Sequence, residues 1–174
     1  MSTNGDPGPS PDGRISLTLP ARDFSLDWRR YNLVANYIAE YASYFYEHKD
    51  RAENVISSVF YELLEHMASI SREDAHLALR LAAENNHLLF EIASSGVDPQ
   101  NRIRHERLVA ELNADRIEKL YRDLLESASD AQDFSGTFGL ALLAHDYHAE
   151  ISTQTGGAGS VLLRATVGQE EMNP

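Results

Sequence analysis

Hydrophobic and polar positions along the chain follow two periods, which predict where the strands and the helices lie. Residues 14–19 alternate with a period of two, as half-buried strands do, and Pro20 ends the run. The same period recurs in four later runs, at residues 75–82, 87–94, 150–155 and 160–167. Turn residues separate the first two of these runs (84–86) and the last two (156–159). The pattern therefore predicts one strand near the N-terminus and two β-hairpins.

Helical spacing separates these strand-like runs. Apolar residues recur every three or four positions in residues 27–46, with Ser25 as the predicted N-cap and Asp27 in the first turn. After a polar break comes the clearest helical pattern of the chain, whose apolar side comprises Val55, Ile56, Val59, Phe60, Leu63, Leu64 and Met67. Residues 100–127 predict two further helices, the second of them capped by Asn113.

Together these elements predict an α/β fold. The expected architecture is a two-layer sandwich, in which a mixed, mostly antiparallel sheet carries three to four helices on one face. One domain is expected over residues 14–167, because a chain of 174 residues can build a single hydrophobic core. Residues 1–13 are rich in Pro, Gly and Ser and predict a disordered leader, and residues 168–174 predict a polar tail.

Composition and charge narrow the classes of partner. The formal net charge of −12 argues against binding to nucleic acid or to an anionic membrane, since both need a basic surface. The chain has no cysteine, so it has neither disulfides nor thiolate metal ligands. No apolar run approaches the length of a membrane span, and the N-terminus lacks the pattern of a secretory signal. A cytoplasmic location is expected.

Tyrosines concentrate in the helix predicted for residues 27–46. Five of the eight lie there: Tyr31, Tyr37, Tyr41, Tyr44 and Tyr46. More than one face of this helix is therefore aromatic. Two interpretations remain open, namely packing into the core with the hydroxyl groups reaching water, or a surface that binds a partner.

Candidate chemistry lies on the polar side of the clearest helix. A spacing of four places Ser58, Glu62 and His66 in one row. Three interpretations fit Glu62 and His66: a solvent-exposed ion pair, a pair of metal ligands, or a general base with a neighbour. His145 and His148 are predicted to lie at the C-terminal end of the last helix, where the helix dipole favours them. They are not expected to bind zinc, because no third ligand lies near them in the sequence.

A glycine-containing stretch introduces that last helix. Gly136, Thr137 and Gly139 come directly before an apolar run and predict a loop followed by a helix. Backbone N–H groups at such a helix start face an anion and the helix dipole favours it, so the stretch fits a phosphate site. The alternative interpretation is an ordinary turn, because glycine often precedes a helix without binding a ligand.

Three motifs together resemble the GHKL ATP-binding fold, which gyrase, Hsp90, histidine kinases and anti-sigma-factor kinases share. Residues 135–141, Ser-Gly-Thr-Phe-Gly-Leu-Ala, are similar to the family's second glycine box, and residues 148–151 to the exit of the following helix. Residues 62–67, Glu-Leu-Leu-Glu-His-Met, resemble the N-box helix. Residues 94–96, Ser-Ser-Gly, stand where the family has the Asp-x-Gly that recognises adenine. In the order of elements, the resemblance extends over residues 14–167.

The resemblance implies a role for each matching residue. Glu62 stands at the position of the general base, and His66 stands where the family's asparagine binds the magnesium of ATP. The implied ATP-contacting residues are Ser58, His66, Ser94, Gly96, Gly136, Thr137 and Gly139. Imidazole suits transition metals better than magnesium, and a serine hydroxyl accepts a weaker hydrogen bond than a carboxylate. ATP and magnesium are therefore the implied cofactors, with turnover expected to be weak or lost.

The region between the motifs refines the resemblance. Two ordinary helices in residues 100–127 stand in place of a variable ATP lid, which is similar to the SiaB-like kinases of bacterial partner switching. The implied function is that of a cytoplasmic bacterial signalling regulator, a pseudokinase that binds a small STAS-like or SiaC-like regulatory protein. Two alternatives remain: an active serine/threonine kinase that uses Mg-ATP, and a structural domain that dimerises through helix 27–46.

Overall fold

The computed structural model of the chain describes residues 15–27, 29–113, 117–127 and 135–172. The leader predicted for residues 1–13 lies outside these ranges. Of the predicted polar tail, residues 168–172 are described; Gly168 ends a strand and a short 3₁₀ turn follows at Gln169–Glu171.

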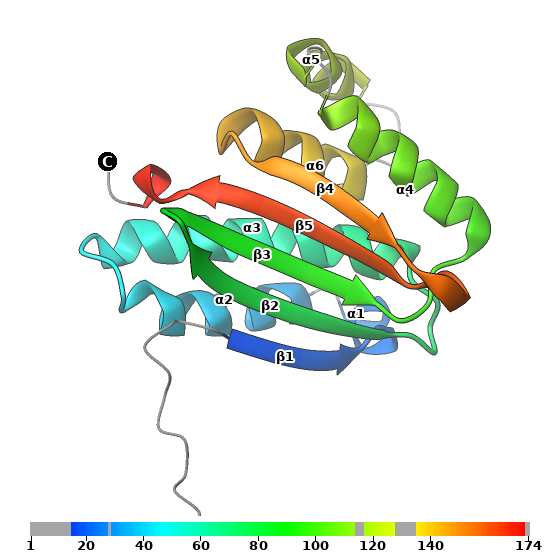
Figure 1. The fold of residues 1–174 in the computed structure, drawn as a ribbon, viewed down its shortest axis with the longest axis horizontal. Coiled ribbons are helices and arrows are strands. Elements are labelled where there is room, and N and C mark those ends of the chain that lie inside the picture. The colour runs from blue at the N-terminus through cyan, green and yellow to red at the C-terminus, as the bar shows by residue number, and fades with distance from the viewer. Residues whose placement is uncertain (1–14, 28, 114–116, 128–134, 173–174) are drawn as a thin grey trace, which may run out of the picture.

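A five-stranded sheet forms one layer of the fold, as predicted (Figure 1). The strands are β1 (Ile15–Pro20), β2 (His76–Glu84), β3 (His87–Ser94), β4 (Glu150–Thr155) and β5 (Val161–Gly168). Their order across the sheet is β1-β2-β3-β5-β4, and each pairing is antiparallel. Both predicted hairpins are confirmed. Asn85 and Asn86 turn the first with positive φ angles of 48° and 65°, which asparagine tolerates better than most residues.

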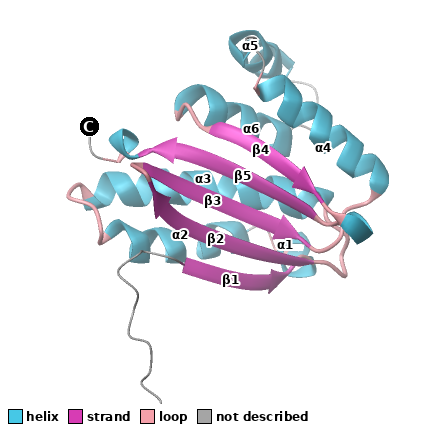
Figure 2. Ribbon diagram, in the orientation of Figure 1, coloured by secondary structure: helices cyan, strands magenta, loops and turns pink. Residues whose placement is uncertain are grey.

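Helices form the second layer, on one face of this sheet (Figure 2). They are α1 (Arg22–Leu26), α2 (Arg29–Ser43), α3 (Lys49–Ile70), α4 (Pro99–Leu112), α5 (Ile117–Ser127) and α6 (Ser135–Asp146). The long helix α3 is central: it packs against β3 and β5, with α2 on one side and α6 on the other. Helix α4 contacts β4 and α6, and α5 contacts α6. The fold is thus an α/β sandwich, and α3 and α6 together carry six of the eight candidate residues: Ser58, Glu62, His66, Gly136, Thr137 and Gly139.

The apolar residues of the helical pattern and those of the strand pattern form one core. The apolar side of α3 and the alternate residues of β2, β3 and β5 are buried against each other. At the centre, Phe60 of α3 and Phe90 of β3 are both fully buried, with ring centroids 5.1 Å apart in an edge-to-face arrangement. Such a pair adds to the energy of burial, so it fixes α3 on the sheet.

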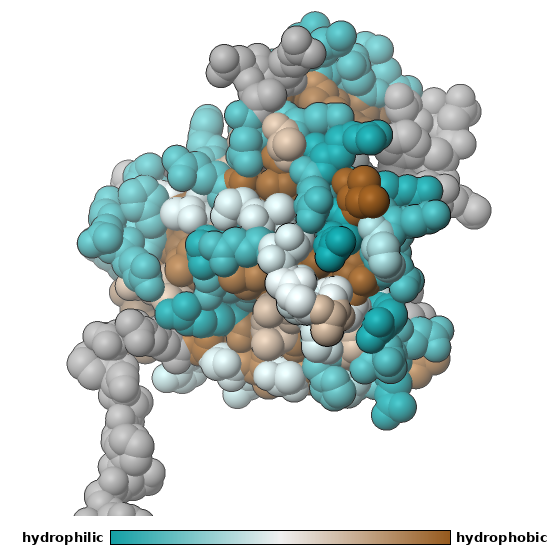
Figure 3. Space-filling view, turned by 45° about the vertical axis from the view of Figure 1, so that its right-hand side comes forward, coloured by the Kyte–Doolittle hydropathy of each residue, from teal (hydrophilic) through white to brown (hydrophobic). Residues whose placement is uncertain are grey.

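An ionic row crosses the other face of the sheet. Arg80, Glu91 and Arg164 are register neighbours on β2, β3 and β5. Arg80 donates to Glu91 at 2.8 Å, and the Arg164 guanidinium donates to the other carboxylate oxygen at 2.6 and 2.9 Å. Burial pushes the pKa of Glu91 upward, but the hydrogen bonds from Arg164 and Arg80 outweigh it and hold the pKa below its usual value. Hydrophilic side chains alternate with smaller hydrophobic patches on the side of the molecule seen in Figure 3.

Two local predictions about helix ends need correction. Ser25 does not cap the second helix, because it lies inside α1; Asp27 takes that role by accepting a hydrogen bond from the backbone N–H of Arg29 at 3.1 Å. Helix α2 ends at Ser43, three residues earlier than predicted. The predicted capping of the following helix by Asn113 falls on residues 114–116, outside the described residues; the Asn113 amide donates to Val109 O of α4 and to Ile151 O of β4, at 3.1 and 2.6 Å.

Candidate functional site

The predicted row on α3 is confirmed as one helix, but its three members have different surroundings. Ser58 and Glu62 are half-buried, whereas His66 is 4% exposed. No β-branched or glycine residue interrupts the turn that carries Glu62 and His66, and Leu63, Leu64 and Met67 of the same turns are fully buried. Burial of that apolar side fixes the direction in which Glu62 projects, toward α6.

Glu62 lies directly against Gly139 of α6. A Cβ atom placed on Gly139 would overlap the Glu62 carboxylate and would come within 2.9 Å of its Cδ and 3.2 Å of its Cβ. Side-chain atoms do not approach so closely, so any larger residue at this position would have to displace the Glu62 side chain. The structure therefore brings together the two elements that the resemblance implied on either side of one site.

The predicted loop at these glycines is wrong. Helix α6 begins at Ser135, so Gly136, Thr137 and Gly139 all lie in its first turns. The glycines predicted a loop because glycine gives the backbone more conformational freedom in a turn. The physical reason at Gly139 is different, because the missing side chain lets α6 approach α3 at the position of Glu62.

The carboxyl group of Glu62 has an unusual proton affinity. Burial, and next the negative charge of Glu65, raise its pKa from 4.5 to about 7. Burial raises the pKa of Glu65 as well. Tyr31 and Tyr61 pack edge to face beside them, with centroids 6.0 Å apart, and this removes water from that side of α3. A carboxyl group that titrates near neutrality can both accept and donate a proton, which is the property of a general acid or base.

His66 belongs to a buried hydrogen-bonded chain that the sequence did not reveal. His66 Nε2 and His105 Nδ1 of α4 are 2.9 Å apart, and His105 Nε2 and Thr153 Oγ1 of β4 are 2.7 Å apart. Burial lowers the pKa of His105 to about 4, so this imidazole is neutral at physiological pH. The chain links α3, α4 and β4 through the two rings and the Thr153 hydroxyl. His66, at the predicted magnesium position, therefore makes a buried structural contact.

Ser94 and Gly96 lie at the C-terminal end of α3. Ser71 Oγ donates to Ser94 Oγ at 2.8 Å, and Gly96 N donates to the same oxygen at 3.3 Å. The guanidinium of Arg72 covers Gly96, where a Cβ would meet it at 2.8 Å. Measured along α3 from Ser71, this group is about 13 Å from Glu62, so only an elongated ligand would reach both.

An open groove borders Ser94 on the strand side. It has a volume of about 270 Å³, and it is lined by Ala93, Ser94, Gln154, Thr155, Gly156, Ser160, Val161 and Leu162. The ends of β3, β4 and β5 and the turn between β4 and β5 supply these residues. Ser94 borders the groove, but its hydroxyl, which was predicted to meet adenine, is buried and bonded to Ser71 and Gly96.

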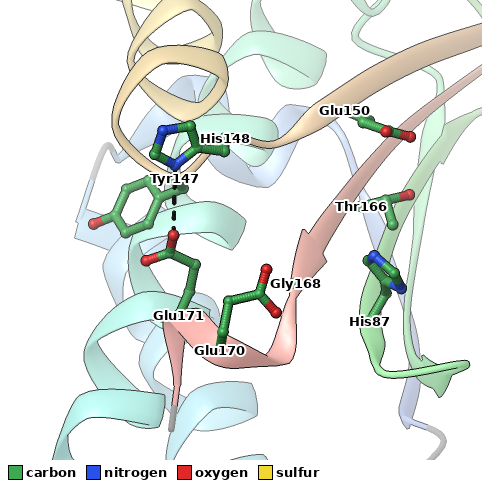
Figure 4. Close-up of a pocket in the computed structure, with 8 residues that line it drawn as sticks. All are labelled: His87, Tyr147, His148, Glu150, Thr166, Gly168, Glu170 and Glu171. Carbon is green, nitrogen blue, oxygen red and sulfur yellow. Dashed lines mark ion pairs between the residues drawn. The ribbon is translucent and has the colours of Figure 1, made fainter. Parts of the chain in front are cut away.

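A second, polar pocket of about 140 Å³ lies at the opposite ends of β3 and β5 (Figure 4). It is lined by His87, Tyr147, His148, Glu150, Thr166, Gly168, Glu170 and Glu171. His148 follows the C-terminus of α6 with φ 49°, and its Nδ1 lies 3.5 Å from the Glu171 carboxylate. The sequence did not predict this pocket, because it combines three segments that are distant in the chain. His145 occupies the last turn of α6, as predicted, and stacks on Tyr121 with centroids 4.2 Å apart.

No protein-family model and no curated protein matches the chain. The function of the site is therefore inferred from its residues and their geometry. Among the described residues, no three histidine, aspartate or glutamate side chains are placed to share a metal ion. In the same part of the chain, no helix is both long enough and apolar enough to cross a membrane.

Glu62 makes the stability of the fold depend on pH in a defined window. Its pKa rises from 4.5 to about 7 on folding, so between these values the folded state retains a proton that the unfolded state has released. The contribution of Glu62 to the free energy of unfolding is therefore fully present below about pH 4.5, falls up to about pH 7 and is constant above it. In the Glu62→Gln variant the side chain cannot ionise, so its contribution to the free energy of unfolding does not fall as the pH rises. We expect the variant to gain roughly 1–2 kcal/mol relative to the wild type between about pH 4 and pH 8, since remaining solvent contact reduces the full effect.

Urea denaturation of both proteins across this range measures the difference. His105, whose pKa is lowered, titrates in both proteins, so the comparison reports Glu62 together with its coupling to Glu65. A stability difference that stays constant with pH would show that Glu62 has an ordinary pKa.

Proposed function

We propose that the chain is a nucleotide-binding signalling regulator of the GHKL type, in which phosphoryl transfer is weak or lost. The observation that carries the proposal is the contact between Glu62 and Gly139. The resemblance requires the N-box glutamate and the helix of the second glycine box to share one site, although the two positions are far apart in the sequence. Their direct contact across α3 and α6 supports that requirement.

The order of elements supports the same proposal. A helix with the candidate base precedes a hairpin, two helices follow, and the glycine-bearing helix leads into a terminal hairpin. The groove beside Ser94 is separate from this contact, because Ala93, Gln154 and Leu162 project from the face of the sheet opposite α3. The proposed nucleotide site therefore rests on Glu62 and Gly139 and not on the groove.

The residues do not fit a bound magnesium ion at the implied position. His66 is buried and its Nε2 is engaged with His105, and imidazole is a poor ligand for magnesium. The described residues supply no alternative cluster of three ligands. We therefore derive no phosphoryl-transfer step. The proposal is a domain whose nucleotide-bound and nucleotide-free states are read by a small regulatory protein, of the STAS-like or SiaC-like kind that the resemblance implies.

An active serine/threonine kinase is the second candidate, and one observation favours it. Glu62 has a pKa of about 7, which suits a general base that takes a proton from a hydroxyl group near neutral pH. In that case Glu62 would accept the proton while other groups held the metal.

Thermal unfolding with added nucleotide tests the proposal. We expect millimolar ATP to raise the melting temperature by about 2–5 °C, as a ligand at roughly ten times its dissociation constant does, with or without magnesium. Glu62→Gln should change this shift, whereas Glu118→Gln, at a side chain that is 77% exposed on α5, should leave it unaltered. His66→Asn, which restores the family's residue, should make the shift depend on magnesium.

The outcomes separate the candidates. A shift that requires magnesium in the wild type, together with phosphate transfer that Glu62→Gln abolishes, supports the active kinase. No shift with any adenine nucleotide removes both nucleotide-dependent functions.

A further inference from the structure

Exposed apolar side chains gather on one wall of the molecule. Among the described residues, eight large hydrophobic side chains are at least half exposed, and six of them belong to the segment around α2: Leu26, Leu33, Tyr37, Tyr41, Tyr44 and Phe45. Isolated exposed hydrophobic residues are ordinary in soluble proteins, but a contiguous group marks an interaction site. Leu33, Tyr37, Tyr41 and Phe45 follow each other at intervals of four and form a single line, here named the α2 stripe.

The α2 stripe is not needed to hold the core together. Helix α2 already buries Tyr31, Ala35 and Ile38 on its opposite side, against α3 and the rest of the core. Tyr37 and Leu33 are 67% and 73% exposed. Each of the two interpretations of the aromatic helix therefore holds for one side of α2. One side packs in the core, and the other side is exposed.

An open sheet edge lies on the same wall. Helix α2 flanks α3 on the side away from α6, and β1 borders the sheet on that side (Figure 1). Strand β1 pairs only with β2 among the described strands, and it carries no charged residue. Natural edge strands are usually protected by charges, bulges or a covering element. The opposite edge shows such protection, since Asn113 of α4 donates to Ile151 O of β4.

We propose that this wall is the interface of a homodimer, with a second copy of the chain as its occupant. A twofold axis beside β1 would pair the two β1 strands antiparallel and join the sheets into one. The same axis would place the two α2 stripes side by side, also antiparallel. Antiparallel strands and helices both satisfy twofold symmetry, so one operation covers the open edge and the apolar stripe together.

The charges along α2 fit a second copy. The chain as a whole has a net charge of −12, which repels another copy, but the four residues of the α2 stripe are uncharged. Arg29 and Arg30 lie at the N-terminal end of α2, where they form exposed ion pairs with Asp27 and Asp23 at 3.0 and 3.5 Å. Glu40 lies in the C-terminal half of α2, and Glu47 follows its end. In the antiparallel arrangement, the arginines of one copy lie nearest the glutamates of the other, which favours this partner and this orientation.

Sedimentation of the full chain at several concentrations tests the proposal. We expect a species of twice the 19.4 kDa chain mass. Tyr37→Glu places two like charges across the twofold axis and should weaken dimerisation at least 100-fold, whereas the matched change Leu125→Glu, on α5, should leave it intact. Arg30→Glu and Glu40→Arg should each weaken the dimer, and the double variant should recover it.

Hydrogen exchange tests the edge pairing separately. Amides of β1 should exchange more slowly in the wild type than in Tyr37→Glu, which stays folded because its side chain is exposed. A monomer at all concentrations, or a dimer unaffected by Tyr37→Glu, would overturn the proposal. Since the α2 stripe is exposed, on the side of α2 away from Tyr31 and the Glu62 site, these outcomes leave the nucleotide response unchanged and do not depend on it.

Discussion

Replacing Gly139 with leucine is expected to destabilise the fold by about 2–4 kcal/mol. The side chain would enter space that the Glu62 carboxylate fills, and it would push α6 away from α3. Helix propensity alone predicts the opposite sign, because leucine stabilises a helix interior relative to glycine by roughly 0.5–1 kcal/mol. The sign of the change therefore decides between close packing and simple helical propensity.

Gly157→Leu is the matched control for this experiment. A Cβ at Gly157 meets no atom within 4 Å, so we expect the control to differ from the wild type by less than about 0.5 kcal/mol. Two smaller substitutions, made singly and together, measure the contact between the two residues. Gly139→Ala should destabilise the wild type, and it should cost about 1–2 kcal/mol less in a Glu62→Ala background. Urea denaturation of these variants gives the values, and additive effects would contradict the contact.

Phe90→Ala is expected to have the largest effect on stability, a loss of about 3–5 kcal/mol. Phe90 is fully buried, and its ring packs edge to face on Phe60 of α3. The truncation removes apolar contact and leaves a cavity between the sheet and α3, which the rigid strands on either side cannot close. Because α3 also carries Glu62, the change should weaken the nucleotide response together with stability.

Chemical denaturation monitored by circular dichroism measures this loss. The control is Leu125→Ala on α5, where the side chain is 50% exposed and the expected loss is below about 1 kcal/mol. Equal losses for the two variants would mean that the Phe60–Phe90 contact does not anchor α3.

The sequence predicted the strands and the central helix because a single local signal governs each. The period of two in residues 87–94 and 150–155 matches β3 and β4 residue for residue. The apolar side of α3 also followed from spacing, since one side of the helix is buried over its whole length. These signals depend on which side faces the core and need no knowledge of the partner element.

Features that depend on a distant partner were not predictable in this way. Gly139 was interpreted as part of a loop, because nothing in the local sequence indicates that Glu62 lies against it. His105 carried no signal, although it joins His66, a residue 39 positions away, to β4. The hydrogen bond from the Asn113 amide to a carbonyl of β4 also had no sign in the local sequence. In each case tertiary packing sets the role of a residue whose type permits several.

In the candidate site, too, the local arrangement was predictable and the contacts with distant elements were not. The row of Ser58, Glu62 and His66 was predicted as one helical line, and it is one. The surroundings of these residues differ, because Glu62 lies against α6 and His66 lies against α4. A near-neutral pKa at Glu62 is a property of that covering and not of the sequence motif.

We propose that nucleotide binds where α3 and α6 meet, at Glu62 and Gly139. Backbone amide chemical shifts followed during titration with ATP test this directly. We expect the largest changes in α3 around Glu62, in α6 around Gly139, and at Ser94 and Gly96 beside the C-terminal end of α3. Changes confined to the pocket around His148 and Glu171, or no change at millimolar ATP, would contradict it.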